Sequence, residues 1–79
     1  MTTSVKIDNI LATAVWFETT KLFVRLSDGR EIATPLSWFP ILQKATDEQR
    51  KNWRFISKGR GIHWADLDED ISIAGLLKL

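Results

Sequence analysis

The sequence contains no cysteine and a single histidine, His63, among its 79 residues. Without thiols it cannot form a disulfide framework, and one imidazole cannot anchor a structural zinc ion. Stability must therefore come from apolar packing, for which four Trp and four Phe supply much of the area in a chain that lacks Tyr. Each ring buries roughly 150–250 Å². We therefore expect residues 1–79 to form a single domain around one core.

Long apolar runs and a strong net charge are also missing. The longest run, residues 10–17, is interrupted by Thr13 and is far shorter than the roughly 20 residues that span a bilayer. Because no signal peptide is present, we expect a cytoplasmic protein. The net charge is +1, but residues 43–60 hold six basic and two acidic side chains, whereas residues 61–79 hold four acidic ones and Lys78. This distribution predicts either internal pairing or two binding surfaces of opposite sign.

The N-terminal half carries the pattern of an antiparallel meander, in which β-branched and aromatic residues are bounded by turn residues. For the second turn we favour a three-residue loop with Gly29 in the left-handed conformation. That register places Arg25 opposite Glu31 and Val24 opposite Ile32, which pairs like residues on each face. The predicted strands are residues 5–17, 21–26 and 30–35.

Two short helices are predicted in the middle of the chain. Pro35 ends the third strand because it has no N–H to donate, and Ser37 is the expected N-cap of a helix from residue 38 to about residue 44. Thr46-Asp-Glu-Gln49 matches a capping box. It predicts a second helix that reaches about Phe55, within a basic helical segment at residues 47–58.

The C-terminal part predicts a further short strand at residues 62–64 and a closing helical turn at residues 72–77. The expected fold class is therefore α+β. Its predicted order is an N-terminal three-stranded antiparallel meander, two short helices, a further short strand and a C-terminal helical turn.

Residues 59–70 concentrate special side chains, including the only histidine and four of the ten carboxylates. We expect the imidazole and indole of this segment to face outward as a desolvated anchor, with the carboxylates as a rim that steers a basic partner. The alternative is that the carboxylates cap the closing helix and pair with the basic segment. The candidate partner-binding residues are His63, Trp64, Asp66, Asp68, Glu69 and Asp70.

Metal binding and catalysis are weaker interpretations of the same segment. Asp66-x-Asp68-x-Asp70 has the spacing of a calcium loop, but Ile71 and Leu77 occupy its required glycine and glutamate positions. A small hydrolase or metal-dependent enzyme centred on His63 would use Ser57 or Ser72 as nucleophile, yet neither serine lies in a nucleophile elbow. Gly59-x-Gly61 lacks the third glycine of a nucleotide-binding loop. We therefore predict no catalytic residue, no metal, no cofactor and no enzymatic activity.

Four basic residues fall at helical spacing if residues 47–58 are helical. Such a stripe is typical of a nucleic-acid-binding or regulatory surface. The competing interpretation is a solvated face that pairs with the acidic segment, which the near-zero net charge favours. The candidate nucleic-acid-binding residues are Arg50, Lys51, Arg54 and Lys58.

Several motifs together resemble one known family over nearly the whole chain. They are Leu26-Ser-Asp-Gly-Arg30, Pro35-Leu-Ser-Trp-Phe-Pro40, Trp53, Gly59-x-Gly-Ile-His-Trp64 and Leu67-Asp-Glu-Asp-Ile-Ser72. The chain thereby resembles the prokaryotic domain-of-unknown-function family 2442. The resemblance implies a compact bacterial α+β domain with no established activity. Some relatives carry an added C-terminal helix-turn-helix domain, and others resemble antitoxin-like partners of a small toxin.

The leading hypothesis is a non-enzymatic protein-interaction module, antitoxin-like and paired with a small toxin. Nucleic-acid binding through the basic segment is the second hypothesis, and the enzyme centred on His63 is the third. A short meander also exposes strand edges, through which two copies can pair as a homodimer.

Overall fold

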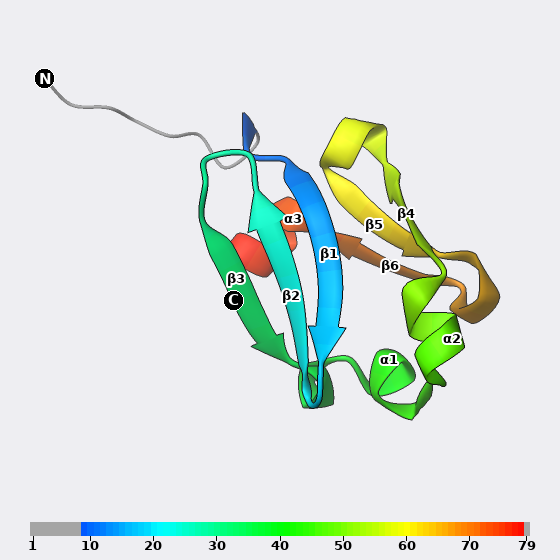
Figure 1. The fold of residues 1–79 in the computed structure, drawn as a ribbon. Helices are drawn as coiled ribbons and strands as arrows, with labels where there is room; N and C mark the ends of the chain where they lie inside the picture. The colour runs from blue at the N-terminus through cyan, green and yellow to red at the C-terminus, as the bar shows by residue number, and fades with distance from the viewer. Residues whose placement is uncertain (1–8, 79) are drawn as a thin grey trace, which may run out of the picture.

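The computed structural model describes residues 9–78, which form two three-stranded antiparallel sheets with short helices packed around them (Figure 1). The first sheet has the order β1-β2-β3 and the second the order β4-β5-β6. The strands are β1 (Ala12–Glu18), β2 (Lys21–Leu26), β3 (Glu31–Pro35), β4 (Trp53–Ile56), β5 (Gly61–Trp64) and β6 (Glu69–Ser72). The helices are η2 (Leu36–Trp38), α1 (Pro40–Lys44), α2 (Asp47–Lys51), η3 (Ser57–Gly59), η4 (Ala65–Leu67) and α3 (Ile73–Leu77).

The β2–β3 hairpin has the predicted bulged register. Arg25 lies opposite Glu31 and Val24 opposite Ile32, and Gly29 has a φ of 93°. The three-stranded meander and the α+β class are thus confirmed. The first strand begins later than expected, at Ala12, and the predicted strand residues 5–8 lie outside the described residues.

The predicted basic helix at residues 47–58 is wrong beyond its first turn. The capping box is present, because Thr46 accepts from the Gln49 amide and Gln49 accepts from the Thr46 amide. The helix α2 nevertheless ends at Lys51, and residues 53–56 form β4. The reason is tertiary: paired with β5, a strand places Trp53 and Phe55 on one face, where both pack against the core.

The other helix ends follow local chemistry only in part. Ser37 is not an N-cap, because it lies inside the 3₁₀ helix η2, and α1 begins at Pro40 with Phe39 as its N-cap. The predicted closing helix is confirmed as α3, and its cap is Ser72, whose hydroxyl accepts from the Gly75 amide. The acidic residues therefore do not cap this helix. None of the helices in residues 9–78 has the length and apolar character needed to cross a membrane.

The core lies between the inner faces of the two sheets and is closed by α1 and α3. Phe17 of β1 meets Trp64 of β5 edge-on, with ring centroids 6.4 Å apart. The turn η3 lies against the start of β1, where Gly59 faces the backbone of Ala12. The largest fully buried side chains are Trp64, Leu22, Leu26, Leu42, Ile62, Ile73 and Val24.

Candidate functional site

Trp64 does not face outward, so its prediction as a docking anchor is wrong. Its side chain is fully buried, and its indole N–H donates to the carbonyl oxygen of Arg50 at 2.9 Å. Trp64 lies on β5, the central strand of the second sheet. Because side chains alternate along a strand, its burial places His63 on the opposite, outer face. The segment predicted as a docking site is therefore divided between the core and the surface.

On that outer face, His63 stands in a cross-strand row between Arg54 of β4 and Asp70 of β6. Its Nδ1 contacts the Asp70 carboxylate, and its side chain is 20% exposed. A depression of about 300 Å³ lies nearby, lined by Ser57, Ser72 and Asp70 among others. The Ser72 hydroxyl is engaged at the start of α3, and within residues 9–78 no hydrogen bond joins His63 to either serine. The row thus contains a histidine–carboxylate pair without an attached nucleophile.

The four carboxylates of residues 66–70 lie at a surface edge formed by η4 and β6. Asp66 accepts from the side-chain amide of Asn52 at 2.9 Å. Asp68 adopts a left-handed conformation with a φ of 49°, and Glu69 accepts from the Asp70 amide. In the described part of the chain none of them forms an ion pair with Lys or Arg, and no three acidic or histidine side chains are placed to hold a metal ion. The described residues therefore do not show the ion pairs that were predicted between these carboxylates and the basic segment.

The four candidate nucleic-acid-binding residues do not share one face. Lys51 is exposed on α2, and Arg54 lies on the outer face of the second sheet. Lys58 belongs to η3, at the end of the molecule opposite α2 (Figure 1). The fourth residue, Arg50, is largely buried, with only 16% of its side chain exposed. The prediction of a single basic helical face is corrected accordingly.

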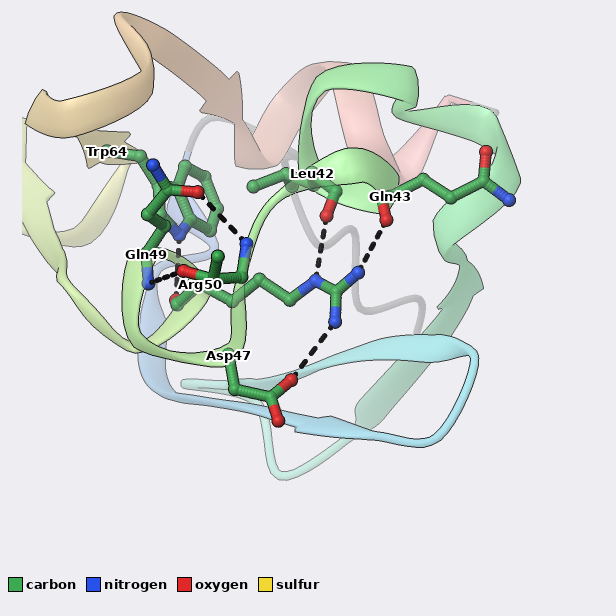
Figure 2. Close-up of polar contacts among 7 residues, drawn as sticks. Leu42, Gln43, Asp47, Gln49, Arg50 and Trp64 are labelled. Atoms are coloured by element: carbon green, nitrogen blue, oxygen red, sulfur yellow. Dashed lines mark hydrogen bonds and ion pairs between the residues drawn. The ribbon is translucent and has the colours of Figure 1, made fainter.

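Arg50 instead joins two helices. Its Nε donates to the carbonyl oxygen of Leu42 at 2.7 Å and its Nη2 to that of Gln43 at 2.6 Å, while Nη1 lies 3.3 Å from the Asp47 carboxylate. Figure 2 shows the guanidinium reaching from α2 to the carbonyl groups at the end of α1. They lie in the last turn of α1, where backbone carbonyls lack intrahelical partners, although the Leu42 oxygen also accepts from the amide of the C-cap residue Ala45 at 3.3 Å. A side chain predicted to be a solvated cation is thus a C-terminal cap for a neighbouring helix.

Two depressions meet at Arg50, between the β1–β2 turn and the helices α1 and α2. They have volumes of about 440 Å³ and 460 Å³, and Thr19 and Arg50 line both. We call this concave region the Arg50 groove. Its lining residues are Phe17, Thr19, Thr20, Lys21, Pro35, Leu36, Ser37, Gln43, Asp47, Arg50 and Lys51.

Two exposed apolar side chains belong to the same end of the molecule. Trp38 is 56% exposed and Ile41 is 47% exposed, and they are the large hydrophobic residues that stand out on the described surface. Both lie in the segment η2–α1, whose neighbours Leu36, Ser37 and Gln43 line the groove. Sequence reasoning placed Trp38 in a helix and did not select it. The sequence feature that could have indicated an exposed Trp38 is its place in a Pro-rich segment too short to form a full amphipathic helix.

Comparison with known proteins supports the fold without adding an activity. A crystal structure of a protein of unknown function from Rhodospirillum rubrum is 28% identical with a TM-score of 0.77, covering 89% of this chain and 87% of that one. A solution NMR structure of an uncharacterised protein from Chromobacterium violaceum is 24% identical with a TM-score of 0.73, covering 86% of this chain and 64% of that one. The latter likeness concerns the fold alone.

Among curated proteins, none matches the sequence significantly. The family model described as "Protein of unknown function (DUF2442)" matches residues 12–79, which include every strand of both sheets. The match contains the Gly-x-Gly-Ile-His-Trp segment and the acidic edge on which the resemblance was based. The chain therefore belongs to the DUF2442 family.

Proposed function

We propose that this domain is a non-enzymatic protein-interaction module that binds its partner at the end of the molecule formed by η2, α1 and the Arg50 groove. More specifically, we propose that the domain is an antitoxin-like partner of a small toxin in a prokaryotic cytoplasm. The family resemblance supports this antitoxin-like role. The choice of surface takes its support from the exposure of Trp38 and Ile41.

The exposure of these two side chains is the observation that carries the proposal. A tryptophan with more than half of its surface in water costs hydrophobic free energy that burial against a partner recovers. Tryptophan is also enriched among the residues that dominate binding energy at protein interfaces. Trp38 and Ile41 are three residues apart, beside a concave region. Large apolar side chains that are exposed near each other are typical of an interaction site.

The acidic edge is the second candidate surface for the same function. Asp66, Asp68 and Asp70 are exposed and, among residues 9–78, unpaired with Lys or Arg. They retain the steering role proposed for a basic partner. With Trp64 in the core, however, this edge has no large apolar side chain to provide an anchor. The end of the molecule that carries Trp38 and Ile41 is therefore preferred as the partner-binding surface.

A homodimer through strand edges is a separate proposal with weaker support. In the described residues the edge strands are β1, β3, β4 and β6, and of these β3 is five residues long and ends in Pro35. Short edges that carry proline resist pairing with a second copy. A homodimer would therefore pair through β1, β4 or β6 rather than β3, and sedimentation equilibrium would report whether it forms.

The test is co-expression with the small protein encoded beside this gene. We expect a complex that co-purifies and, if the neighbour is a toxin, relief of growth arrest. The double variant Trp38→Ala and Ile41→Ser should abolish both effects while leaving the amide spectrum of the folded domain otherwise unchanged.

The matched control is Asp66→Asn with Asp68→Asn, which alters the acidic edge and spares the groove. Loss of binding in this control alone would move the contact to the acidic edge. Absence of a complex with the products of both flanking genes would contradict the protein-interaction proposal itself. Turnover of a substrate that depends on His63 would replace it with the enzymatic hypothesis.

A further inference from the structure

We propose that the Arg50 groove binds an acidic segment of a polypeptide, with a carboxylate of that segment taking the place of Asp47 against the Arg50 guanidinium. The proposal deepens the function proposed above by naming the chemistry of the partner, and it rests on that function for the existence of a natural partner. The carboxylate site itself is argued from the geometry of the groove.

Arg50 is prepared to accept a ligand because its position is fixed while part of its donor capacity is unused. A guanidinium has five N–H donors. Within residues 9–78, one acceptor each is found for Nε, Nη1 and Nη2, so two N–H groups have no protein acceptor. The two carbonyl bonds hold the planar group, which is mostly removed from water. A charge-assisted bond to such a preorganised donor is stronger than one to a mobile surface arginine.

Asp47 occupies this position only weakly. Its carboxylate is 3.3 Å from Nη1, and its side chain is 88% exposed. Surface ion pairs of this kind contribute roughly 0–1 kcal/mol. A carboxylate from a ligand that enters the groove therefore displaces Asp47 at little cost, and Asp47 is free to turn into solvent.

The charges that line the groove favour an anionic segment. Lys21, Arg50 and Lys51 face only one lining carboxylate, that of Asp47. Neither lysine forms an ion pair in the described part of the chain. Glu18, the backbone partner of Lys21, accepts instead from the indole N–H of Trp16. Hydroxyl groups of Thr19, Thr20 and Ser37 add donors along the same surface.

The groove also has an apolar part, which favours a peptide over a nucleic acid. Pro35 and Leu36 line one of the two depressions, and the exposed Trp38 follows Ser37, which also lines it, in the sequence. An extended segment that alternates acidic and apolar residues would match both parts. Nucleic-acid binding requires several cations spaced along a phosphate backbone, and the basic residues that would continue such a track, Arg54 and Lys58, lie elsewhere.

The test uses the synthetic peptide acetyl-Glu-Leu-Glu-Leu-Glu-amide and its glutamine counterpart, titrated into the ¹⁵N-labelled protein at low salt. We expect saturable shifts of the Thr19, Thr20 and Lys51 amides and of the Arg50 Nε–H resonance with the acidic peptide only. Affinity should fall as the salt concentration rises. Equal shifts with the glutamine peptide, or shifts centred away from the groove, would overturn the proposal.

The decisive variants differ by one position on the same helix turn. Asp47→Asn removes the internal competitor and should tighten binding of the acidic peptide about two- to five-fold. Glu48→Gln removes the same charge from the first turn of α2 without touching Arg50, and should change the affinity by less than about two-fold. Equal effects of the two variants would reduce the site to general electrostatics and reject a carboxylate at Arg50.

Substitutions of exposed lysines complete the test. Lys21→Gln and Lys51→Gln should each weaken the acidic peptide about two- to five-fold, whereas Lys58→Gln, at the far end of the molecule, should not. Tighter binding of single-stranded oligothymidylate than of the peptide would overturn the choice of ligand. If the peptide behaves as expected but the products of both flanking genes form no complex with the domain, the proposed function fails and the carboxylate site stands.

Discussion

Trp64 of β5 donates its indole N–H to the backbone carbonyl oxygen of Arg50 in α2, at 2.9 Å. The side chain of the same arginine donates to two carbonyl groups of α1. One residue therefore connects the central strand of the second sheet with both helices that border the groove. The buried tryptophan, which sequence reasoning assigned to a docking surface, helps to position the groove from the inside.

Replacing Trp64 by Phe should destabilise the domain by about 2–4 kcal/mol. The substitution leaves a cavity in the core and removes the donor to the Arg50 carbonyl oxygen, which is left unpaired. Urea unfolding followed by circular dichroism measures the change. Trp38→Phe is the matched control, because Trp38 is exposed and its replacement should cost less than about 0.5 kcal/mol. Similar losses for the two variants would contradict the burial of Trp64.

Replacing Arg50 by Lys should cost about 1–2 kcal/mol even though the charge is retained. An ammonium group cannot donate in the guanidinium geometry to the carbonyl oxygens of Leu42 and Gln43. We expect faster amide hydrogen exchange in α1 as well as a lower free energy of unfolding. Asp47→Asn, at an exposed position, should change the stability by less than about 0.5 kcal/mol. Unchanged exchange in α1 of the lysine variant would show that the guanidinium does not cap the helix.

Alanine substitutions at Thr46 and Ser37 compare an N-cap that the structure shows with one that was only predicted. Thr46→Ala removes an N-cap that accepts from the Gln49 amide and should lower the free energy of unfolding by about 1 kcal/mol. Ser37→Ala should change it by less than about 0.5 kcal/mol, because its side chain caps no helix. Thermal unfolding of the two variants side by side is the measurement. A larger loss for Ser37→Ala would contradict the observed start of α1.

The elements that could be predicted from sequence are those set by local chemistry. The capping box at Thr46, the bulged hairpin at Gly29 and the closing helical turn each involve residues within a few positions of one another. Their hydrogen bonds form whatever the rest of the chain does. Propensity and turn chemistry therefore suffice to place them.

Elements that depend on distant pairing could not be placed in the same way. Residues 53–56 satisfy both a helical stripe and a strand alternation, and only their pairing with β5 selects the strand. The strand β6 lies within an acidic segment of low strand propensity and exists because it completes the sheet beside β5. In a strand of four residues, a shift of one position exchanges the two faces. The prediction turned both His63 and Trp64 outward, but adjacent residues of one strand point to opposite faces, and the structure buries Trp64.

The Arg50 groove escaped prediction for a related reason. Its walls come from the β1–β2 turn, η2, α1 and α2, which the chain brings together only when both sheets are formed. The sequence around Arg50 contains only the signs of an exposed basic helix. Its contacts with the carbonyl groups of α1, seven and eight residues earlier, follow no sequence rule.

Asp28 provides a prediction about pH. The backbone N–H of Arg30 donates to its carboxylate, and this bond, assisted by the Arg30 guanidinium, lowers the pKa of Asp28 below its ordinary value of 3.8. A lowered folded-state pKa stabilises the fold above the unfolded-state value, and this contribution is lost as the pH falls through the folded-state pKa. The stability difference between wild type and Asp28→Asn should therefore be constant at neutral pH and shrink only in strong acid. A carboxyl ¹³C titration midpoint for Asp28 above 3.8 would contradict this.

Alanine substitutions at Gly59 and Gly29 allow the cost of backbone strain to be separated from the cost of a steric clash. Both have a positive φ, 97° and 93°, so alanine is strained at either position by roughly 1–3 kcal/mol. A Cβ at Gly29 meets nothing within 4 Å, whereas one at Gly59 would lie 2.9 Å from the carbonyl oxygen of Ala12. Gly59→Ala should therefore cost clearly more than Gly29→Ala in urea unfolding, because β1 must move away from η3. Equal costs would mean that the second sheet does not press against the start of the first, and the packing of the two sheets would need another explanation.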